Sequence, residues 1–221
     1  MVKSRIAWLS ATAALLLSSV VYGGDLSQYR QFRLESGLAG IAAQAKLDPQ
    51  AAKLIHDRPA RIEELSWRSG PEDSVKGILF SFYDGELFRM VVDYDRYNTA
   101  GLTSDDMIEA LSAGYGPSAN PAAAITVPST YGSEETVTVI ARWEDPHWTL
   151  DLVRFKYEPS FALVGWSKKL HEPARAAVAE AIRLDRLEAP QRAIQQKKEQ
   201  DAANQAEAQE ARRLNKPGFR P

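Results

Sequence analysis

Two tryptophans, two acids and a histidine lie within residues 143–148 (WEDPHW). Tryptophan offers a large contact area and an N–H donor, and it is enriched at binding sites. Exposed at a turn, Trp143, His147 and Trp148 could form a platform for a protein partner or a sugar. Alternatively, both tryptophans pack in the core of a sheet, since tryptophan is well buried on average. These three residues are our candidate partner-binding residues.

The sequence contains no complete catalytic, metal or nucleotide motif. Its histidines, His56, His147 and His171, have no second histidine at i+2 or i+4, and there is no cysteine to complete a zinc set. Residues 93–98 begin like a calcium loop but lack the later oxygen ligands. Neither G-x-S-x-G nor a glycine-rich phosphate loop occurs. We therefore expect no cofactor and no metal, and we assign no catalytic residue.

Acids that are far apart in the sequence could still meet in space. Glu63, Glu64, Asp93 and Glu144 could supply a carboxylate pair, with or without His147, in a cleft between two halves of the chain. Such a protein would be an envelope hydrolase. This alternative requires His147, Glu144 or Asp93 to converge with another titratable group in a concave pocket.

The first 23 residues have the three parts of an export signal. Two cations precede an almost wholly apolar stretch at 6–21, and Val21 and Gly23 fit a small-residue cleavage site. An uncleaved anchor is the alternative, but the apolar stretch is shorter than the roughly 20 residues that span a bilayer. We expect a signal peptide at 1–23, export by the Sec route to the periplasm or the exterior, and no stable membrane anchor after cleavage.

Charge is spread unevenly along the chain, whose net charge is -2 over 221 residues. Residues 24–170 hold 15 basic and 21 acidic side chains, whereas residues 171–221 hold 10 and 8. An acidic body lacks the cations that neutralise phosphates, so we expect no nucleic-acid partner. Without cysteine, no disulfide can stabilise the exported fold.

Residues 24–100 are expected to form a first α+β half. A short strand is expected at 29–34, and apolar residues recur at helical spacing over 38–45. Asp48 before Pro49 has the chemistry of a helix start, which predicts a second short helix through Ile55.

Strand patterns follow at 62–67, 75–83 and 86–95. Asp84-Gly85 joins the last two and is a strong hairpin signal, because both residues tolerate a positive φ. One face of this hairpin is expected to carry the core side chains Ile78, Phe80, Phe82, Phe88, Met90, Val92 and Tyr94.

Residues 101–170 repeat the order of a helix followed by strands. Thr103 and Asp106 resemble a capping box, which predicts a helix as far as Tyr115. Residues 117–134 are rich in Pro, Ala, Ser and Gly and predict a long loop. Further strands are expected at 135–143, 148–157 and 161–167.

Residues 171–221 form a polar, helix-favouring tail. Pro173 fits a helix start, one face of which could dock on the body, and Pro190 is expected to interrupt the helix. Beyond it the sequence predicts a solvated helix or a disordered tail. Four cations of the tail could meet an acidic partner or an anionic surface, namely Arg183, Arg186, Lys197 and Lys198.

These patterns together predict an α+β protein with short helices packed on antiparallel β-meander sheets, followed by a long C-terminal helix or a disordered tail. The halves 24–100 and 101–170 could be a duplication with two sheets or parts of one continuous sheet.

The order of elements, with residues 34–38 (LESGL), 65–67 (LSW) and 82–87 (FYDGEL), resembles the helix-helix-meander unit of small exported bacterial domains. Those domains are the SmpA/OmlA-like outer-membrane assembly lipoproteins and the β-lactamase-inhibitor-like proteins. The resemblance covers residues 29–95, with an echo at 103–168, and implies a module that works by protein contact.

The chain departs from those lipoproteins in two ways. It has no cysteine to carry a lipid, and residues 46–49 (KLDP) replace their Gly-x-Pro turn. The resemblance therefore transfers no binding residue. The whole chain also resembles uncharacterised exported bacterial proteins. We expect a non-catalytic interaction module of the bacterial envelope, with another envelope protein as its partner.

Overall fold

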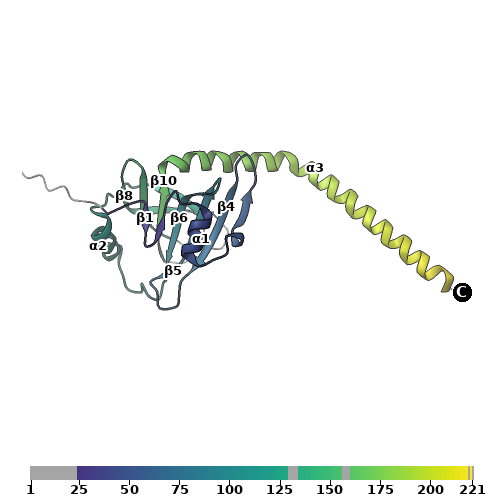
Figure 1. Ribbon diagram of the computed structural model, residues 1–221, viewed down its shortest axis with the longest axis horizontal. Helices are drawn as coiled ribbons and strands as arrows, with labels where there is room; N and C mark the ends of the chain where they lie inside the picture. The colour runs from purple at the N-terminus through teal and green to yellow at the C-terminus, as the bar shows by residue number, and fades with distance from the viewer. Residues whose placement is uncertain (1–23, 129–133, 156–159, 219, 221) are drawn as a thin grey trace, which may run out of the picture.

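A single eight-stranded antiparallel sheet forms the body of the protein, and a long helix extends from it (Figure 1). The computed structural model describes residues 24–128, 134–155, 160–218 and 220, so the expected signal peptide lies outside the described residues. In spatial order the strands are β3 (Lys53–His56), β4 (Ile62–Arg68), β5 (Val75–Tyr83), β6 (Glu86–Tyr94), β10 (Phe161–Ser167), β9 (Trp148–Arg154), β8 (Glu134–Glu144) and β7 (Ala124–Pro128). The predicted α+β class is confirmed.

The strand order is symmetric about the junction of β6 and β10. Each half contributes a helix, α1 (Leu38–Ala45) or α2 (Ser104–Tyr115), and then a four-stranded meander. The last strands of the two meanders pair antiparallel, with Leu163 opposite Val92. Of the two arrangements that the sequence left open, the structure has one continuous sheet.

The predicted hairpin of β5 and β6 is present, with one difference in its faces. Asp84 and Gly85 form its turn with φ of 47° and 84°, as the Asp-Gly pair predicts. The register shifts between Ser81 and Phe82, which is a β-bulge. Phe88 therefore belongs to a cluster on the other face, and its predicted alignment with Met90, Val92 and Tyr94 is wrong.

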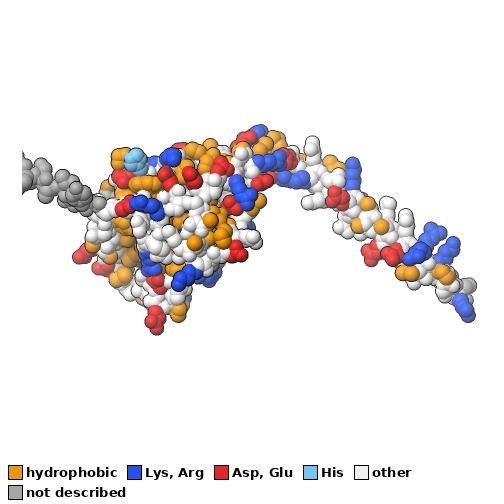
Figure 2. Space-filling model, in the orientation of Figure 1, with side chains coloured by type: hydrophobic (Ala, Val, Ile, Leu, Met, Phe, Trp, Pro, Cys, Tyr) orange, Lys and Arg blue, Asp and Glu red, His pale blue; other side chains and the backbone are white. Residues whose placement is uncertain are grey.

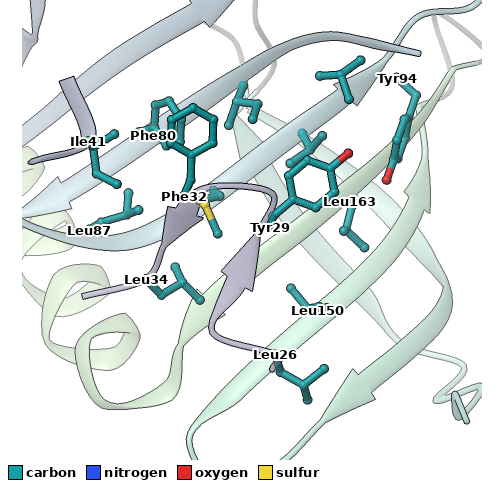
Figure 3. Packing of buried hydrophobic residues seen from close by; sticks show 14 of the residues in the cluster. Leu26, Tyr29, Phe32, Leu34, Ile41, Phe80, Leu87, Tyr94, Leu150 and Leu163 are labelled. Carbon is teal, nitrogen blue, oxygen red and sulfur yellow. The ribbon is translucent and has the colours of Figure 1, made fainter. Parts of the chain in front are cut away.

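The main core lies on one face of the sheet, beneath α1, α2 and a small hairpin (Figure 3). That hairpin comprises β1 (Gln28–Tyr29) and β2 (Phe32–Arg33), where the sequence predicted one strand. Its Phe32 ring is completely buried and lies 4.8 Å from the Phe80 ring. Arg30 takes a positive φ of 53° in the turn, and its side chain forms two hydrogen bonds with Asp73.

Both edge strands differ from the sequence prediction. Asp48 does cap a turn, accepting the N–H of Gln50 at 2.8 Å, but the turn is only the 3₁₀ segment η1 (Pro49–Ala51). The expected second helix is wrong, because the residues after it pair with β4 as β3. At the opposite edge, β7 occupies part of the expected loop 117–134 and pairs with β8.

Helix α3 (Lys168–Asn215) covers part of the second face of the sheet. Its buried residues recur at spacings of four, three and four along one stripe: Leu170, Ala174, Ala177 and Ala181. Leu170 and Ala174 contact Phe88 there, and the small alanines let the helix lie close to the sheet. The helix is capped by Ser167 and begins earlier than Pro173, where the sequence placed its start.

The predicted interruption of the helix at Pro190 is wrong, because α3 continues through this residue. Proline removes one helical hydrogen bond and bends a helix. Figure 1 shows α3 bending as it leaves the body.

The short 3₁₀ segment η2 (Lys216–Gly218) follows α3. No helix within the described ranges is both long enough and apolar enough to cross a bilayer.

A buried ion pair also stabilises the second face. The carboxylate of Asp151 in β9 is completely buried and accepts two hydrogen bonds from Arg142 in β8, at 2.6 and 2.7 Å. Burial raises the pKa of Asp151, and the guanidinium of Arg142 opposes that shift. The pair therefore ties β8 to β9 and satisfies a charge that has no access to water.

We expect Arg142→Met to lower the free energy of unfolding by about 3–5 kcal/mol, because it leaves a buried carboxylate without its partner. Urea denaturation measures the change. The double variant Arg142→Met/Asp151→Leu is the control and should recover most of the loss, since an apolar pair replaces the ion pair. A loss of less than about 1 kcal/mol in the single variant would contradict the role given to the pair.

Candidate functional site

Trp143, a candidate partner-binding residue, is a core residue of the main cluster. Its side chain is 2% exposed, and its indole N–H donates to the carbonyl oxygen of Gly116 at 2.9 Å. The ring lies 6.4 Å from that of Tyr115 at the end of α2. These contacts fix α2 against the sheet and leave Trp143 out of reach of a partner.

Of the other two candidates, His147 lies in the turn between β8 and β9, and Trp148 is the first residue of β9. The Asp145 carboxylate accepts the backbone N–H groups of His147 and Trp148, both at 2.7 Å, and so builds the turn. Trp148 is half-buried against the main core, whereas His147 is exposed. The structure therefore brings His147 and Trp148 together without Trp143, and no platform of two tryptophans forms.

Lys168, the first residue of α3, fastens this turn to the helix. Its ammonium donates to the Glu144 carboxylate at 3.0 Å and to the carbonyl oxygen of Asp145 at 2.8 Å. The hydrogen bond from Lys168 lowers the pKa of Glu144. A lowered pKa is the opposite of the raised pKa that a general acid of this kind needs.

The acids proposed for a hydrolase do not converge. Following the pairing of β6, β10, β9 and β8, Glu144 lies in the row of Arg89, four residues along β6 from Asp93. The Cα atoms of Glu144 and Asp93 are thus separated by about 13 Å along the strands and about 14 Å across them. Glu63 and Glu64 lie in β4, where they form ion pairs with Arg61 at 2.9 Å and with Arg89 at 3.8 Å. Within the described ranges, no three His, Asp or Glu side chains gather as a metal site would require.

A cavity of about 230 Å³ opens at the end of β6. It is lined by Lys76, Tyr94, Asp95, Arg96, Tyr97 and Ser160. Its carboxylate belongs to Asp95, which accepts the N–H groups of Tyr97 at 2.9 Å and Asn98 at 3.0 Å. That carboxylate holds the loop in place, and none of the proposed hydrolase residues lines the cavity.

His171 forms a contact between α3 and the sheet that the sequence did not indicate. Its ring stacks on Trp166 of β10, with centroids 5.1 Å apart and planes 23° apart. Nδ1 is buried without a hydrogen-bond partner among the described residues. Burial lowers the pKa of His171, and the nearby guanidinium of Arg89 lowers it further.

Helix α3 offers the candidate interface. Among the described residues none after Ala181 is buried, although Leu184 is half-buried and Arg58, in the loop before β4, forms an ion pair with Glu188. Leu187 and Ile194 are 62% and 59% exposed. Seven residues apart, they lie on the same face of the helix.

The cations named in the tail have different environments. Arg183 donates two hydrogen bonds to Glu180, at 2.6 and 2.7 Å, so its charge is paired within the helix. Lys198 follows Ile194 by four residues and lies beside it on the same face. Figure 2 shows apolar, basic and acidic side chains interspersed along this part of α3.

Comparisons with protein-family models, curated proteins and solved structures found no match to this chain. The resemblance to SmpA/OmlA-like and β-lactamase-inhibitor-like domains therefore stays a prediction.

We expect the protein to lose stability as the pH falls below about 6.5, the ordinary pKa of histidine. Because the folded state lowers the pKa of His171, the unfolded chain binds a proton first. The stabilising contribution is complete above about 6.5 and is lost as the pH falls through the lower pKa of the folded state. Urea midpoints at about pH 7.5 and about pH 5.5 measure it.

His171→Phe provides the comparison, because phenylalanine can still stack on Trp166 but does not titrate. The fall in midpoint between the two pH values should be smaller in this variant than in the wild type. Equal falls would show that the titration of His171 does not contribute.

Proposed function

We propose that this chain is a non-catalytic, exported interaction module of the bacterial envelope that presents α3 to another envelope protein. The observation that supports it is the projection of α3: the helix is docked through Ala181, has half-buried side chains at Leu184 and Glu188, and carries exposed side chains only from Ala189 to Asn215. The exposed apolar side chains in this part of the helix are therefore available for a partner.

Leu187 and Ile194 supply the contact in this proposal. Amphipathic helices bind grooves through apolar anchors at helical spacing, of which i and i+7 are one pair. Lys198 on the same face favours a partner with acidic groups beside its apolar groove. The separation of Glu144 from Asp93 weighs against the hydrolase alternative.

We expect Leu187→Gln/Ile194→Gln to abolish crosslinking to the partner in the envelope of living cells. Glutamine keeps a good helix propensity, so the change removes apolar contact rather than the helix. Crosslinked products of tagged chains, identified by mass spectrometry, measure the effect. The matched control is Ala202→Gln/Ala206→Gln, two exposed positions farther along α3, and it should crosslink like the wild type.

If the wild type, the variant and the control all crosslink equally to the same partner, the contact lies outside this face of α3. Wild-type chains that give no crosslinked product would count against the interaction function itself.

Export is tested separately. We expect the chain expressed in a Gram-negative host to be recovered from the periplasm and to begin at Gly24, because the sequence places cleavage after Gly23. Fractionation and N-terminal sequencing measure both points. A chain that stays in the cytoplasm with its first residues intact would contradict the expected export.

A further inference from the structure

The far end of α3 concentrates positive charge. Residues 211–221 contain Arg212, Arg213, Lys216 and Arg220 and no acid. All four cations are exposed, and none forms an ion pair with another described residue. Leu214 lies among them with 63% of its surface exposed. We call these four cations with Leu214 the basic tip; blue side chains mark this end of the helix in Figure 2.

The basic tip is held away from an acidic body. From Pro190 to Asn215 the helix rises about 39 Å, at about 1.5 Å for each residue. The screening length at physiological ionic strength is about 8 Å. The net negative charge of residues 24–170 is therefore too far away to neutralise the tip. A negative surface that the tip reaches would also be too far away to repel these residues.

The residues before the tip offer little to a protein groove. From Gln195 to Arg213 the sequence has no apolar side chain larger than alanine. Protein interfaces depend on a few large apolar, aromatic or arginine anchors in pockets. Four cations around one exposed leucine instead match a flat negative surface, where charge attraction and a shallow apolar contact act together.

We propose that the basic tip of α3 binds the surface of an anionic phospholipid membrane. Binding is peripheral, because the described residues include no helix able to span a bilayer. Each cation near such a surface raises the partition coefficient about fivefold. Four cations give weak, reversible and salt-sensitive binding that holds the body at a distance set by the helix.

Cations at the end of a helix also interact with its dipole, which could account for Arg212 and Arg213 without any membrane. The two roles have different readouts. Loss of a dipole interaction reduces helicity in solution, whereas loss of a membrane contact reduces vesicle binding at unchanged helicity.

The test is sedimentation of the chain from Gly24 onward with phosphatidylcholine vesicles, prepared with and without phosphatidylglycerol. We expect binding to the anionic vesicles only, and loss of that binding when salt rises from about 0.05 M to about 0.5 M. The tip variant, with Arg212, Arg213, Lys216 and Arg220 changed to Gln, should lose binding by roughly two orders of magnitude or more.

The matched control changes four other cations of α3 to Gln, at Lys169, Arg175, Arg186 and Lys197. It lowers the net charge of the chain equally but should keep vesicle binding within about threefold of the wild type, because these positions lie beyond the screening length from the tip. Circular dichroism is recorded for all three chains. Failure of the wild type to bind anionic vesicles would overturn the proposal, as would equal loss in both variants or a loss explained by lower helicity.

Discussion

The pairing of β6 with β10 is the contact on which the rest of the structure depends. A four-stranded meander with one short helix buries little apolar surface, and small sheets need further packing for independent stability. Joining the two meanders through their last strands makes one sheet with a continuous apolar face. It also places α1 and α2 on that face together, so a single core forms between them.

The same pairing creates a second face that has to be covered. The bulge in the hairpin of β5 and β6 turns Phe88 toward that face. Helix α3 follows β10 directly, and Leu170 and Ala174 contact Phe88. The alanine stripe then keeps α3 close to the sheet as far as Ala181. The direction in which the helix leaves the body is thus set by contacts near its start.

Local signals explain which parts of the fold could be predicted from the sequence. The Asp84-Gly85 turn and the Thr103–Asp106 capping box depend on residues adjacent in the chain, and both form as expected. The edge strands β3 and β7 depend on pairing with β4 and β8. Asp48, before β3, does cap the start of a helical turn. The turn ends after Ala51 because the residues that follow pair at the edge of the sheet.

The candidate site was harder to predict for a related reason. A tryptophan such as Trp143 can bind a partner or fill a core, and its residue type does not decide between the two. Its burial results from the packing of α2 on β8. The sequence did not indicate a contact for His171. Its ring stacks on Trp166, five residues earlier, only because α3 begins directly after β10. Pro190 predicted an interruption of the helix, whereas good helix formers on both sides continue α3 through it.

A helix serves better than a flexible tail if the end of the chain has to work at a distance from the body. The residues from Pro190 to Asn215 would span about 28 Å on average as a flexible coil and would fluctuate widely. As a helix they span about 39 Å with a defined direction. Pairs such as Gln195 with Glu199 and Gln200 with Asn204 support the helix beyond its contacts with the body. Alanine, glutamine, glutamate and lysine then continue it by propensity alone. A composition with nothing to bury in its own fold is therefore suited to fixing the separation between the body and whatever the far end contacts.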